Sequence, residues 1–390
     1  MLHKTCFNVA NLALAATLVC TVTLTACGGG GTIKPNSSAA IWPPVPTLIA
    51  HRGASAARPE HTIAAYTQAI EDGADMIEPD LVPTKDGVLV ARHESAIAIL
   101  NPDGTVREAT TDIATRAEFA NLLTTKTIDG TTVRGWFTED MTLAQLKTLR
   151  AVERIPVIRP ANVAFNGQFQ VPTLQEVIDL AKAKSIEKGR KIGVYPETKH
   201  PTYFKSIGLP LERRLIDVLA ANGWNSKDAP VFIQSFEVGN LKELRGLTTA
   251  RITQLLSARG RPFDFVAAGL GETRSYADLI TPTGLREVAT YANAIGPSKD
   301  MVIPVVNGVL GTPTPLVANA KAANLITHIY TLRPENIFLP PNLKKAPVTD
   351  NTFRGDSVTE IQAFLQAGID GFFTDDSAVG RTAILRFAKK

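Results

Sequence analysis

The sequence predicts an α/β fold: a TIM-type (β/α)8 barrel with an inserted subdomain after the second βα region. The first indication is that short apolar, strand-like runs alternate with amphipathic helical stretches through most of the 390 residues. The second is that several of these runs end directly at charged or imidazole side chains. In parallel βα folds, functional residues follow the carboxyl ends of the strands, so this arrangement is typical of an enzyme.

The first strand-like runs lie between Leu48 and His93, with a helix predicted at Ile63–Ile70 from its apolar spacing. These runs are Leu48–Ala50, Met76-Ile77 and Val88–Ala91. They end, in the same order, at His51-Arg52-Gly53, Glu78-Pro79-Asp80 and Arg92-His93. The third run is predicted to be an extra hairpin strand rather than a barrel strand.

The alternation stops after His93. Asp-Gly and Asn-Gly pairs, which form turns, and one short helix predicted at Thr142–Leu149 take its place. We therefore predict that residues 94–170 form the inserted subdomain and lie over the strand ends.

From Thr173 the alternation resumes with a helix, which Thr173 and Glu176 begin as a capping box. Further helices are predicted at Leu209–Ala221 and Val358–Ala367. The remaining predicted strands are Ile192–Pro196, Val231–Phe236, Ile252–Leu256, Ala294–Pro297, Ile326–Leu332 and Gly371–Thr374. With the first two runs these make eight, the number of strands in a closed barrel of this type.

The composition narrows the class of protein. With 44% apolar and 20% charged residues the chain is an ordinary globular one. Its formal charge of +4 is spread out, so we expect no nucleic-acid partner. A weak basic bias suits an anionic small-molecule substrate.

The N-terminus resembles an export signal. Lys4 precedes an apolar stretch of the length of a secretory h-region, and Leu24-Thr25-Ala26-Cys27 resembles a bacterial lipobox. We predict a lipoprotein signal peptide at residues 1–26, lipidation of Cys27, a flexible tether at 27–46 and the barrel domain at 47–390. The alternative is an ordinary signal peptide with a chance cysteine. Cys6, Cys20 and Cys27 are the only cysteines, so a mature body would have no disulfide or thiol chemistry.

Three carboxylates at strand ends are candidate metal ligands. Glu78 and Asp80 are two residues apart and point to the same face of a strand, and Glu197 ends the next main strand. Such an oxygen-only set suits Mg²⁺ or Ca²⁺ better than zinc. The alternative is that these carboxylates are surface charges or ion-pair partners of Arg52 and Lys199.

Histidines and cations complete the candidate site. His51 and His93 both end strand-like runs and are candidates for a general acid and base, although a lone histidine is more often structural. Arg52 and Lys199 offer a guanidinium fork and an ammonium, which suit a phosphate group beside a divalent cation. Their alternative role is charge compensation of the carboxylates. His200, next to Lys199, is a candidate for lining the pocket.

These segments together resemble the signature of the glycerophosphodiester phosphodiesterase family. The matching early motifs are His51-Arg52-Gly53, Pro59-Glu60-His61-Thr62, Ile77-Glu78-Pro79-Asp80, Thr84-Lys85-Asp86-Gly87 and His93. The later ones are Tyr195-Pro196-Glu197-Thr198-Lys199, Gln234-Ser235-Phe236 and Phe373-Thr374-Asp375. The insertion, with Trp136-Phe137-Thr138-Glu139-Asp140 and Thr173-Leu174, is similar to that of the larger periplasmic-type members.

The resemblance implies metal-dependent hydrolysis of glycerophosphodiesters, such as glycerophosphocholine, to sn-glycerol 3-phosphate and an alcohol. It implies that His51 and His93 are the acid–base pair and that Glu78, Asp80 and Glu197 hold one divalent cation, Ca²⁺ or Mg²⁺. It also implies that Arg52 and Lys199 bind the phosphate and that Glu60 lies near the site. The family usually has Asn where this chain has His61, and often Asp or another residue where it has Glu94. These differences put substrate preference in doubt more than activity.

Alternatives remain at this point. A related barrel phospholipase acting on intact lipids would need an exposed apolar rim near its pocket, which the sequence does not identify. The other alternative is a non-catalytic lipoprotein that binds phosphodiesters. The aromatics Trp136, Phe137 and Phe165 of the insertion are candidates for the head-group pocket, although such residues more often belong to a core. For the whole protein we expect a lipid-anchored location on the periplasmic side of the outer membrane.

Overall fold

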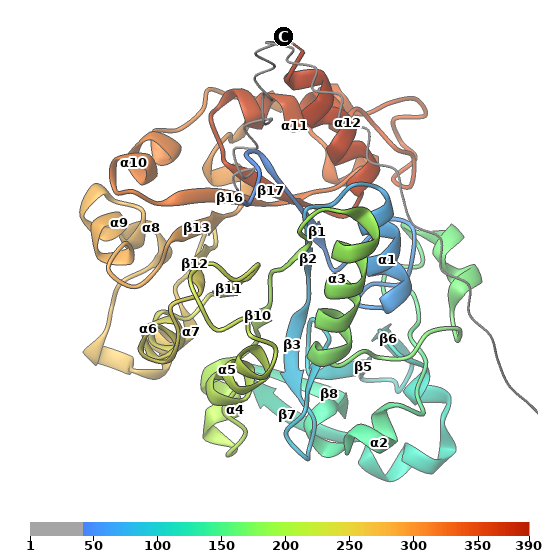
Figure 1. The fold of residues 1–390 in the computed structure, drawn as a ribbon. Coiled ribbons are helices and arrows are strands. Elements are labelled where there is room, and N and C mark those ends of the chain that lie inside the picture. Colours follow the sequence, from blue (N-terminus) through green and yellow to red (C-terminus); the bar gives the residue numbers. More distant parts are fainter. Residues whose placement is uncertain (1–41, 390) are drawn as a thin grey trace, which may run out of the picture. The chain divides into compact units, whose positions relative to one another are not determined.

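The computed structural model describes residues 42–389, and within them a parallel sheet closes into a barrel of eight strand positions. The closure is visible at β1, which pairs in parallel with β2 on one side and with β17 on the other (Figure 1). In chain order the positions are β1 (Thr47–His51), β2 with β3 (Met76–Glu78, Asp80–Pro83), β9 with β10 (Gly193–Val194, Glu197–Thr198), β11 (Phe232–Ser235), β12 (Arg251–Leu256), β13 (Ala294–Pro297), β16 (Ile326–Leu332) and β17 (Gly371–Thr374). The predicted barrel is confirmed.

Two of these positions are each interrupted by a proline. Pro79 separates β2 from β3, and Pro196 separates β9 from β10. Proline has no N–H group to donate to the ladder. Its carbonyl still accepts, because the N–H of Glu197 donates to Pro79 O and that of Gln234 to Pro196 O, both over 2.9 Å. The sheet therefore stays continuous across both interruptions.

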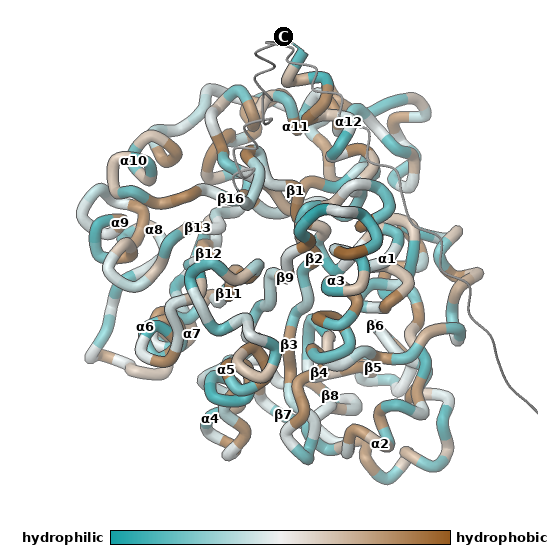
Figure 2. The backbone as a smooth tube through the Cα atoms, viewed as in Figure 1, coloured by the Kyte–Doolittle hydropathy of each residue, from teal (hydrophilic) through white to brown (hydrophobic). Residues whose placement is uncertain are grey.

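Helices surround the barrel and cover the outer face of its strands (Figure 1). One follows each strand position: α1 (Ile63–Glu71), α3 (Leu174–Lys188), α5 (Glu212–Ala221), α6 (Val238–Leu247), α9 (Pro282–Val288), α10 (Leu316–Ala322), α11 (Ser357–Gln366) and α12 (Ser377–Phe387). Hydrophilic residues alternate with hydrophobic ones along α3 and α5 (Figure 2), as expected for helices with one buried face. The capping box of Thr173 and Glu176 begins α3, as predicted. None of the helices within residues 42–389 has the length and hydrophobicity needed to span a membrane.

The inserted subdomain follows β4 (Leu89–Ala91), which pairs antiparallel with β3 as the predicted hairpin strand. Four strands form a separate antiparallel sheet in the order β6-β5-β8-β7, beside the barrel (Figure 1). They are β5 (Ala96–Leu100), β6 (Val106–Ala109), β7 (Thr124–Ile128) and β8 (Thr131–Phe137), and the short α2 (Leu143–Leu146) follows. The sequence predicted turns and one helix here but not this sheet, because β7 and the start of β8 are mostly exposed threonines without apolar alternation.

Short elements extend the loops at the carboxyl ends of later strands. They are α4 (Pro201–Ser206), α7 (Phe263–Ala267), α8 (Tyr276–Leu279) and the small hairpin of β14 (Val305–Val306) and β15 (Val309–Leu310). The predicted signal peptide, Cys27 and most of the predicted tether lie outside the described residues.

Apolar side chains fill the inside of the barrel. One buried cluster consists of Ile49, Met76, Tyr195, Phe232, Ala294 and Phe373. Tyr195 stacks on Phe232 with ring centroids 5.1 Å apart, and its hydroxyl lies 3.0 Å from Nδ1 of the buried His328. His328 is thus a structural histidine. With this cluster inside the barrel, the charged residues of the cavity lie at the carboxyl ends of the strands.

Candidate active site

A cavity of about 140 Å³ lies at the carboxyl ends of the barrel strands. Its walls combine polar residues from the early strands with apolar side chains from the later ones. Seven of the eight residues predicted for the chemistry line it: His51, Arg52, Glu78, Asp80, His93, Glu197 and Lys199. The remaining wall consists of Gln234, Phe236, Leu255, Tyr330, Thr331, Arg333 and Phe373.

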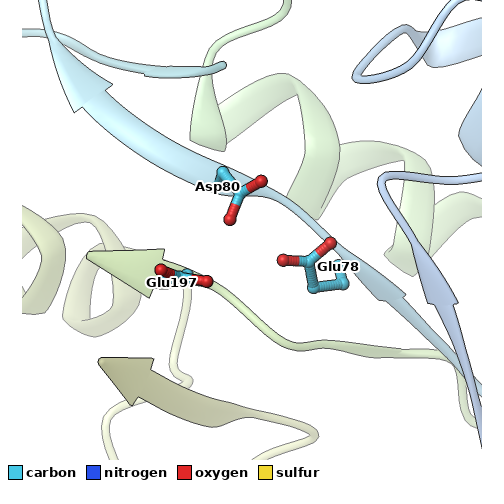
Figure 3. Close-up of side chains that lie close together, drawn as sticks. All are labelled: Glu78, Asp80 and Glu197. Atoms are coloured by element: carbon cyan, nitrogen blue, oxygen red, sulfur yellow. The ribbon is translucent and has the colours of Figure 1, made fainter. Parts of the chain in front are cut away.

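The three predicted metal ligands point toward one another (Figure 3). Among the described residues, Glu78, Asp80 and Glu197 form a buried group with one oxygen of each within 4.8 Å of the others. Glu78 ends β2 and Asp80 begins β3, so both face inward on either side of Pro79. Asp80 and Glu197 are register partners on adjacent strands, which brings the third carboxylate alongside.

Without a cation, burial and mutual repulsion of the three ionised carboxylates would destabilise the folded chain. Burial, and then the neighbouring charges of Asp80 and Glu197, raise the pKa of Glu78 well above its usual value. Burial also raises the pKa of Glu197 to about 7, although Lys199 opposes the rise. Among the described residues, Oε1 of Gln234 is buried in the same cavity with no hydrogen-bond partner. These oxygen donors fit a divalent cation such as Mg²⁺ or Ca²⁺.

Arg52 lies in a tight turn directly after β1. Arg52 has φ +59° and Gly53 has φ +87°, and a Cβ at Gly53 would approach the backbone carbon of Ala65 to 2.7 Å, so only glycine fits there. The turn lets the Arg52 N–H donate to Glu78 over 2.8 Å. The guanidinium donates to both oxygens of Glu60, over 3.1 and 3.2 Å.

Lys199 contacts the third carboxylate, Glu197. Its Nζ lies 2.9 Å from Oε1 of Glu197 and 3.3 Å from Nε2 of His93. Both predicted phosphate-binding cations therefore already compensate carboxylate charge, as the alternative interpretation proposed. These pairings also hold the two cations at the cavity wall.

His51 is held by Asp375, a residue of a matching motif to which the sequence assigned no role. Nδ1 of His51 lies 2.6 Å from Oδ1 of Asp375, which follows β17. This carboxylate assigns the imidazole proton to Nδ1 and leaves Nε2 as the acceptor. Burial, and then Arg52, lower the pKa of His51 to about 4. The histidine is therefore neutral near pH 7.

Asp375 is in turn held by arginines. Nη2 of Arg159, from the insertion, donates to Oδ2 of Asp375 over 2.5 Å, and Nε of Arg333 lies 3.2 Å from the same oxygen. The guanidinium of Arg159 also donates to Glu335 over 2.7 Å and is buried. Asp375 follows a strand end like the predicted residues, so that rule would have found it. No local signal in the sequence indicates Arg159.

His93 has a matching arrangement. Its Nδ1 lies 2.9 Å from Oε1 of Glu94, and burial, Arg52 and Lys199 lower its pKa to about 3. The second oxygen of Glu94 lies 2.7 Å from Nε2 of His200. His200 therefore lies behind the His93–Glu94 pair, and not in the wall of this cavity.

His61, to which the sequence assigned no part in the chemistry, supports a predicted ligand. It is fully buried, with Nε2 2.9 Å from Oδ2 of Asp80 and Nδ1 2.8 Å from the hydroxyl of Tyr66. Burial opposes the ionisation of Asp80, yet nearby cations and the contact with His61 hold its pKa well below the usual value. His61 therefore orients Asp80 from outside the cavity.

Two sets of predicted residues lie away from the cavity. Glu60 is near the site but behind Arg52, where Arg154 of the insertion also donates to it over 3.0 Å. The aromatics of the insertion, which were candidates for the head-group pocket, do not line the cavity. Trp136 and Phe137 are buried in the subdomain core, and Phe165 packs under the guanidinium of Arg58. Aromatic residues in a small sheet are needed for its own core.

The comparisons with known proteins agree with this fold. The model of the glycerophosphoryl diester phosphodiesterase family matches residues 51–379. A glycerophosphodiester phosphodiesterase of Arabidopsis thaliana is 34% identical over 342 residues, which cover 85% of this chain and 83% of the relative. One of Haemophilus influenzae is 27% identical over 314 residues, covering 73% and 78%.

Solved structures share the barrel. A putative glycerophosphoryl diester phosphodiesterase from Silicibacter pomeroyi has a TM-score of 0.58 at 18% identity, covering 89% of this chain and 95% of that one. An Oleispira antarctica phosphodiesterase in complex with the product sn-glycerol-3-phosphate has a TM-score of 0.53 at 18% identity, covering 87% and 97%. At this identity the likeness shows the fold. Since the family model spans most of the chain, the chain belongs to the glycerophosphoryl diester phosphodiesterase family and is a phosphoric diester hydrolase.

Proposed function

We propose that this hydrolase cleaves glycerophosphodiesters derived from deacylated phospholipids, such as glycerophosphocholine, to sn-glycerol 3-phosphate and a free alcohol. The observation that carries the proposal is one cavity lined by three buried carboxylates, two histidines and two cations. The product sn-glycerol-3-phosphate bound to the Oleispira antarctica phosphodiesterase supports this choice of substrate class.

Glu78, Asp80 and Glu197 would hold one divalent cation, Ca²⁺ or Mg²⁺. Bound there, the ion would stabilise the negative charge that develops on the phosphoryl oxygens. Arg52 and Lys199 act on the same charge from the protein side. Their ion pairs with Glu60 and Glu197 keep both cations positioned before substrate binds, so little reorganisation is needed in the transition state.

His51 and His93 exchange protons with the substrate. In each, Nδ1 faces a carboxylate, so Nε2 is the atom that takes up or gives the proton. One histidine removes the proton of the attacking group, which is either water or a glycerol hydroxyl that forms a cyclic phosphate for water to open. The other histidine protonates the leaving alkoxide, and each proton transfer contributes roughly 10²–10⁴-fold. Both are neutral in the free protein near pH 7, so the acid takes up its proton when the anionic substrate is bound.

The test is release of sn-glycerol 3-phosphate from a panel of glycerophosphodiesters, each assayed with Ca²⁺ and with Mg²⁺. The proposal expects turnover of the deacylated substrates. Faster turnover of intact phosphatidylcholine would show instead that the enzyme is a phospholipase. Release of glycerol and the phosphorylated head group, in place of sn-glycerol 3-phosphate and the free alcohol, would show that the other ester bond is cut.

For the location we propose an exported lipoprotein, anchored through Cys27 on the periplasmic side of the outer membrane. Its support is the lipobox-like Leu24-Thr25-Ala26-Cys27. Incorporation of a labelled fatty acid into the wild-type chain, and its loss in Cys27→Ser, is the expected result. Equal labelling of both chains, or none in either, would contradict the anchor.

A further inference from the structure

Exposed apolar side chains concentrate on four loop segments: residues 154–165 of the insertion, 257–275 after β12, 298–315 after β13 and 333–356 after β16. Ten of the sixteen large apolar residues that are exposed in the described part of the chain lie in these segments. Leu270 is 99% exposed and Val157 81%, and three valines of the β14–β15 hairpin are also exposed. We refer to the exposed apolar side chains of these four segments as the apolar rim.

Topology places the apolar rim around the cavity entrance. Three of the segments begin directly after β12, β13 and β16, and Leu255, Tyr330 and Arg333, on or next to β12 and β16, line the cavity wall. The segments also contact one another. Arg159 of the insertion pairs with Glu335 over 2.7 Å, and the N–H of Asn342 donates to Gly308 O over 3.3 Å. These contacts join three of the segments, and the fourth, residues 257–275, begins beside them because the N–H of Ser298 donates to Leu256 O over 3.0 Å.

The form of the rim favours a lipid surface over a shaped protein partner. Its exposed apolar residues come from four separate loop segments, among them the loop of Leu270 and the β14–β15 hairpin, and not from one helix or sheet face. Protein interfaces need close shape complementarity, whereas the fluid boundary of a bilayer accepts separate apolar projections.

Charge points to the same partner. The four segments together carry ten Lys or Arg residues and six Asp or Glu residues. Arg259 and Lys345 are exposed among them, as is Asp300, so the excess of basic residues would meet anionic lipid head groups. We propose that the apolar rim docks the mouth of the barrel onto the surface of a phospholipid bilayer that contains anionic lipids. The choice of lipid draws support from the proposed function, whose substrates derive from phospholipids.

The first test measures binding of the full chain to vesicles of phosphatidylcholine and phosphatidylglycerol, in a Cys27→Ser background that carries no lipid on that residue. Leu270→Asp combined with Val306→Asp should lower binding about tenfold or more, because two apolar side chains are lost from the contact. Matched controls are Ile186→Asp on α3 and Leu385→Asp on α12, at residues 84% and 55% exposed outside the rim. They should bind like the parent chain, and all variants should keep their turnover of soluble substrate.

A second measurement locates the contact, whatever else in the chain binds lipid. Cys6, Cys20 and Cys27 are the only cysteines, so replacing them with serine allows one labelled cysteine to be introduced. An environment-sensitive fluorophore on Leu270→Cys should shift to the blue with vesicles and be quenched by lipid-borne quencher, while the same fluorophore on Ile186→Cys should not.

Equal responses at the two positions, or no response at position 270, would overturn the proposal. So would self-association of the chain that the rim substitutions abolish, which would assign the rim to a second copy. Because neither measurement requires turnover, failure of the proposed substrate assignment would appear in the activity assay alone.

Discussion

Each of the two cavity histidines has Nδ1 against a carboxylate, but the two carboxylates have different support. Asp375 beside His51 is buried and held by the guanidiniums of Arg159 and Arg333. Glu94 beside His93 is about a third exposed and is held by His200. Because two arginines fix Asp375, we expect it to hold the ring of His51 more rigidly than the partly exposed Glu94 holds the ring of His93.

Removal of either histidine should stop catalysis without unfolding the chain. We expect His51→Ala and His93→Ala each to lower kcat by roughly 10²–10⁴-fold, because each loses one proton transfer. Circular dichroism should remain unchanged, since both side chains lie at the cavity and outside the apolar core. Near-wild-type turnover in either variant would remove that histidine from the mechanism.

Arg159 should act through Asp375, as a positioning residue. We expect Arg159→Ala to lower kcat about tenfold, on the order of 1.4 kcal/mol, with KM little changed. In an Asp375→Asn background the same substitution should cost much less, because its partner is already altered. Arg213→Ala, at an exposed arginine of α5, is the control. Additive losses in the double variant would show that Arg159 acts on the fold alone.

At the scale of elements, the carboxylate group is a product of strand pairing. Proline interrupts two adjacent strand positions, at Pro79 and Pro196, and the predicted ligands flank these interruptions. The register of β3 with β10 then sets Asp80 beside Glu197. Three buried carboxylates are thereby held together by backbone geometry, and their repulsion makes the group selective for a cation.

Chelation should abolish turnover, and Ca²⁺ or Mg²⁺ should restore it. The same ion should stabilise the folded chain, by about 2.7 kcal/mol at a concentration one hundred times its Kd, because it binds the native state and relieves the repulsion. Thermal unfolding with and without the ion measures this. The ion should no longer raise Tm in Asp80→Asn. Full turnover in excess chelator would contradict the metal assignment.

At the scale of the whole molecule, buried or partly buried ion pairs tie the insertion to the barrel. Arg154 and Arg159 reach Glu60 and Asp375, and Asp129, in the turn between β7 and β8, lies 2.6 Å from Nδ1 of His200. The insertion therefore supports both histidine–carboxylate pairs without lining the cavity. Displacement of the insertion would disturb both ends of the proposed proton transfer.

The His200 link should make stability depend on pH. Burial opposes its charge, but the contacts with Asp129 and Glu94 raise its pKa to about 9. Since this is above the unfolded value of about 6.5, the stabilisation is complete below pH 6.5 or so and is lost as pH rises through about 9. Urea unfolding should show His200→Gln less stable by about 3 kcal/mol at low pH, and the difference should vanish above about pH 10. A difference that stays constant with pH would contradict the charged link.

The sequence by itself determined the alternation of strands and helices and the polar residues at the strand ends. Both are local signals: hydrophobic period and chain position identify His51, Glu78, Asp80 and Glu197 without knowledge of their neighbours. The barrel follows from them, because parallel strands with crossover helices have few ways to close. Glu60 could be placed near the site but not behind Arg52, since side-chain direction is not a local property.

Only the tertiary structure decided which distant loops meet. Asp375 reaches His51 across 324 residues of sequence and Arg159 across 216, and no period or spacing encodes such pairs. The sheet of the insertion and the apolar rim were also absent from the sequence prediction, because mostly polar strands lack alternation and exposed apolar residues resemble core residues until burial is known. Local chemistry thus identified the candidate residues of the site, while the closure of the chain selected the residues that support and surround them.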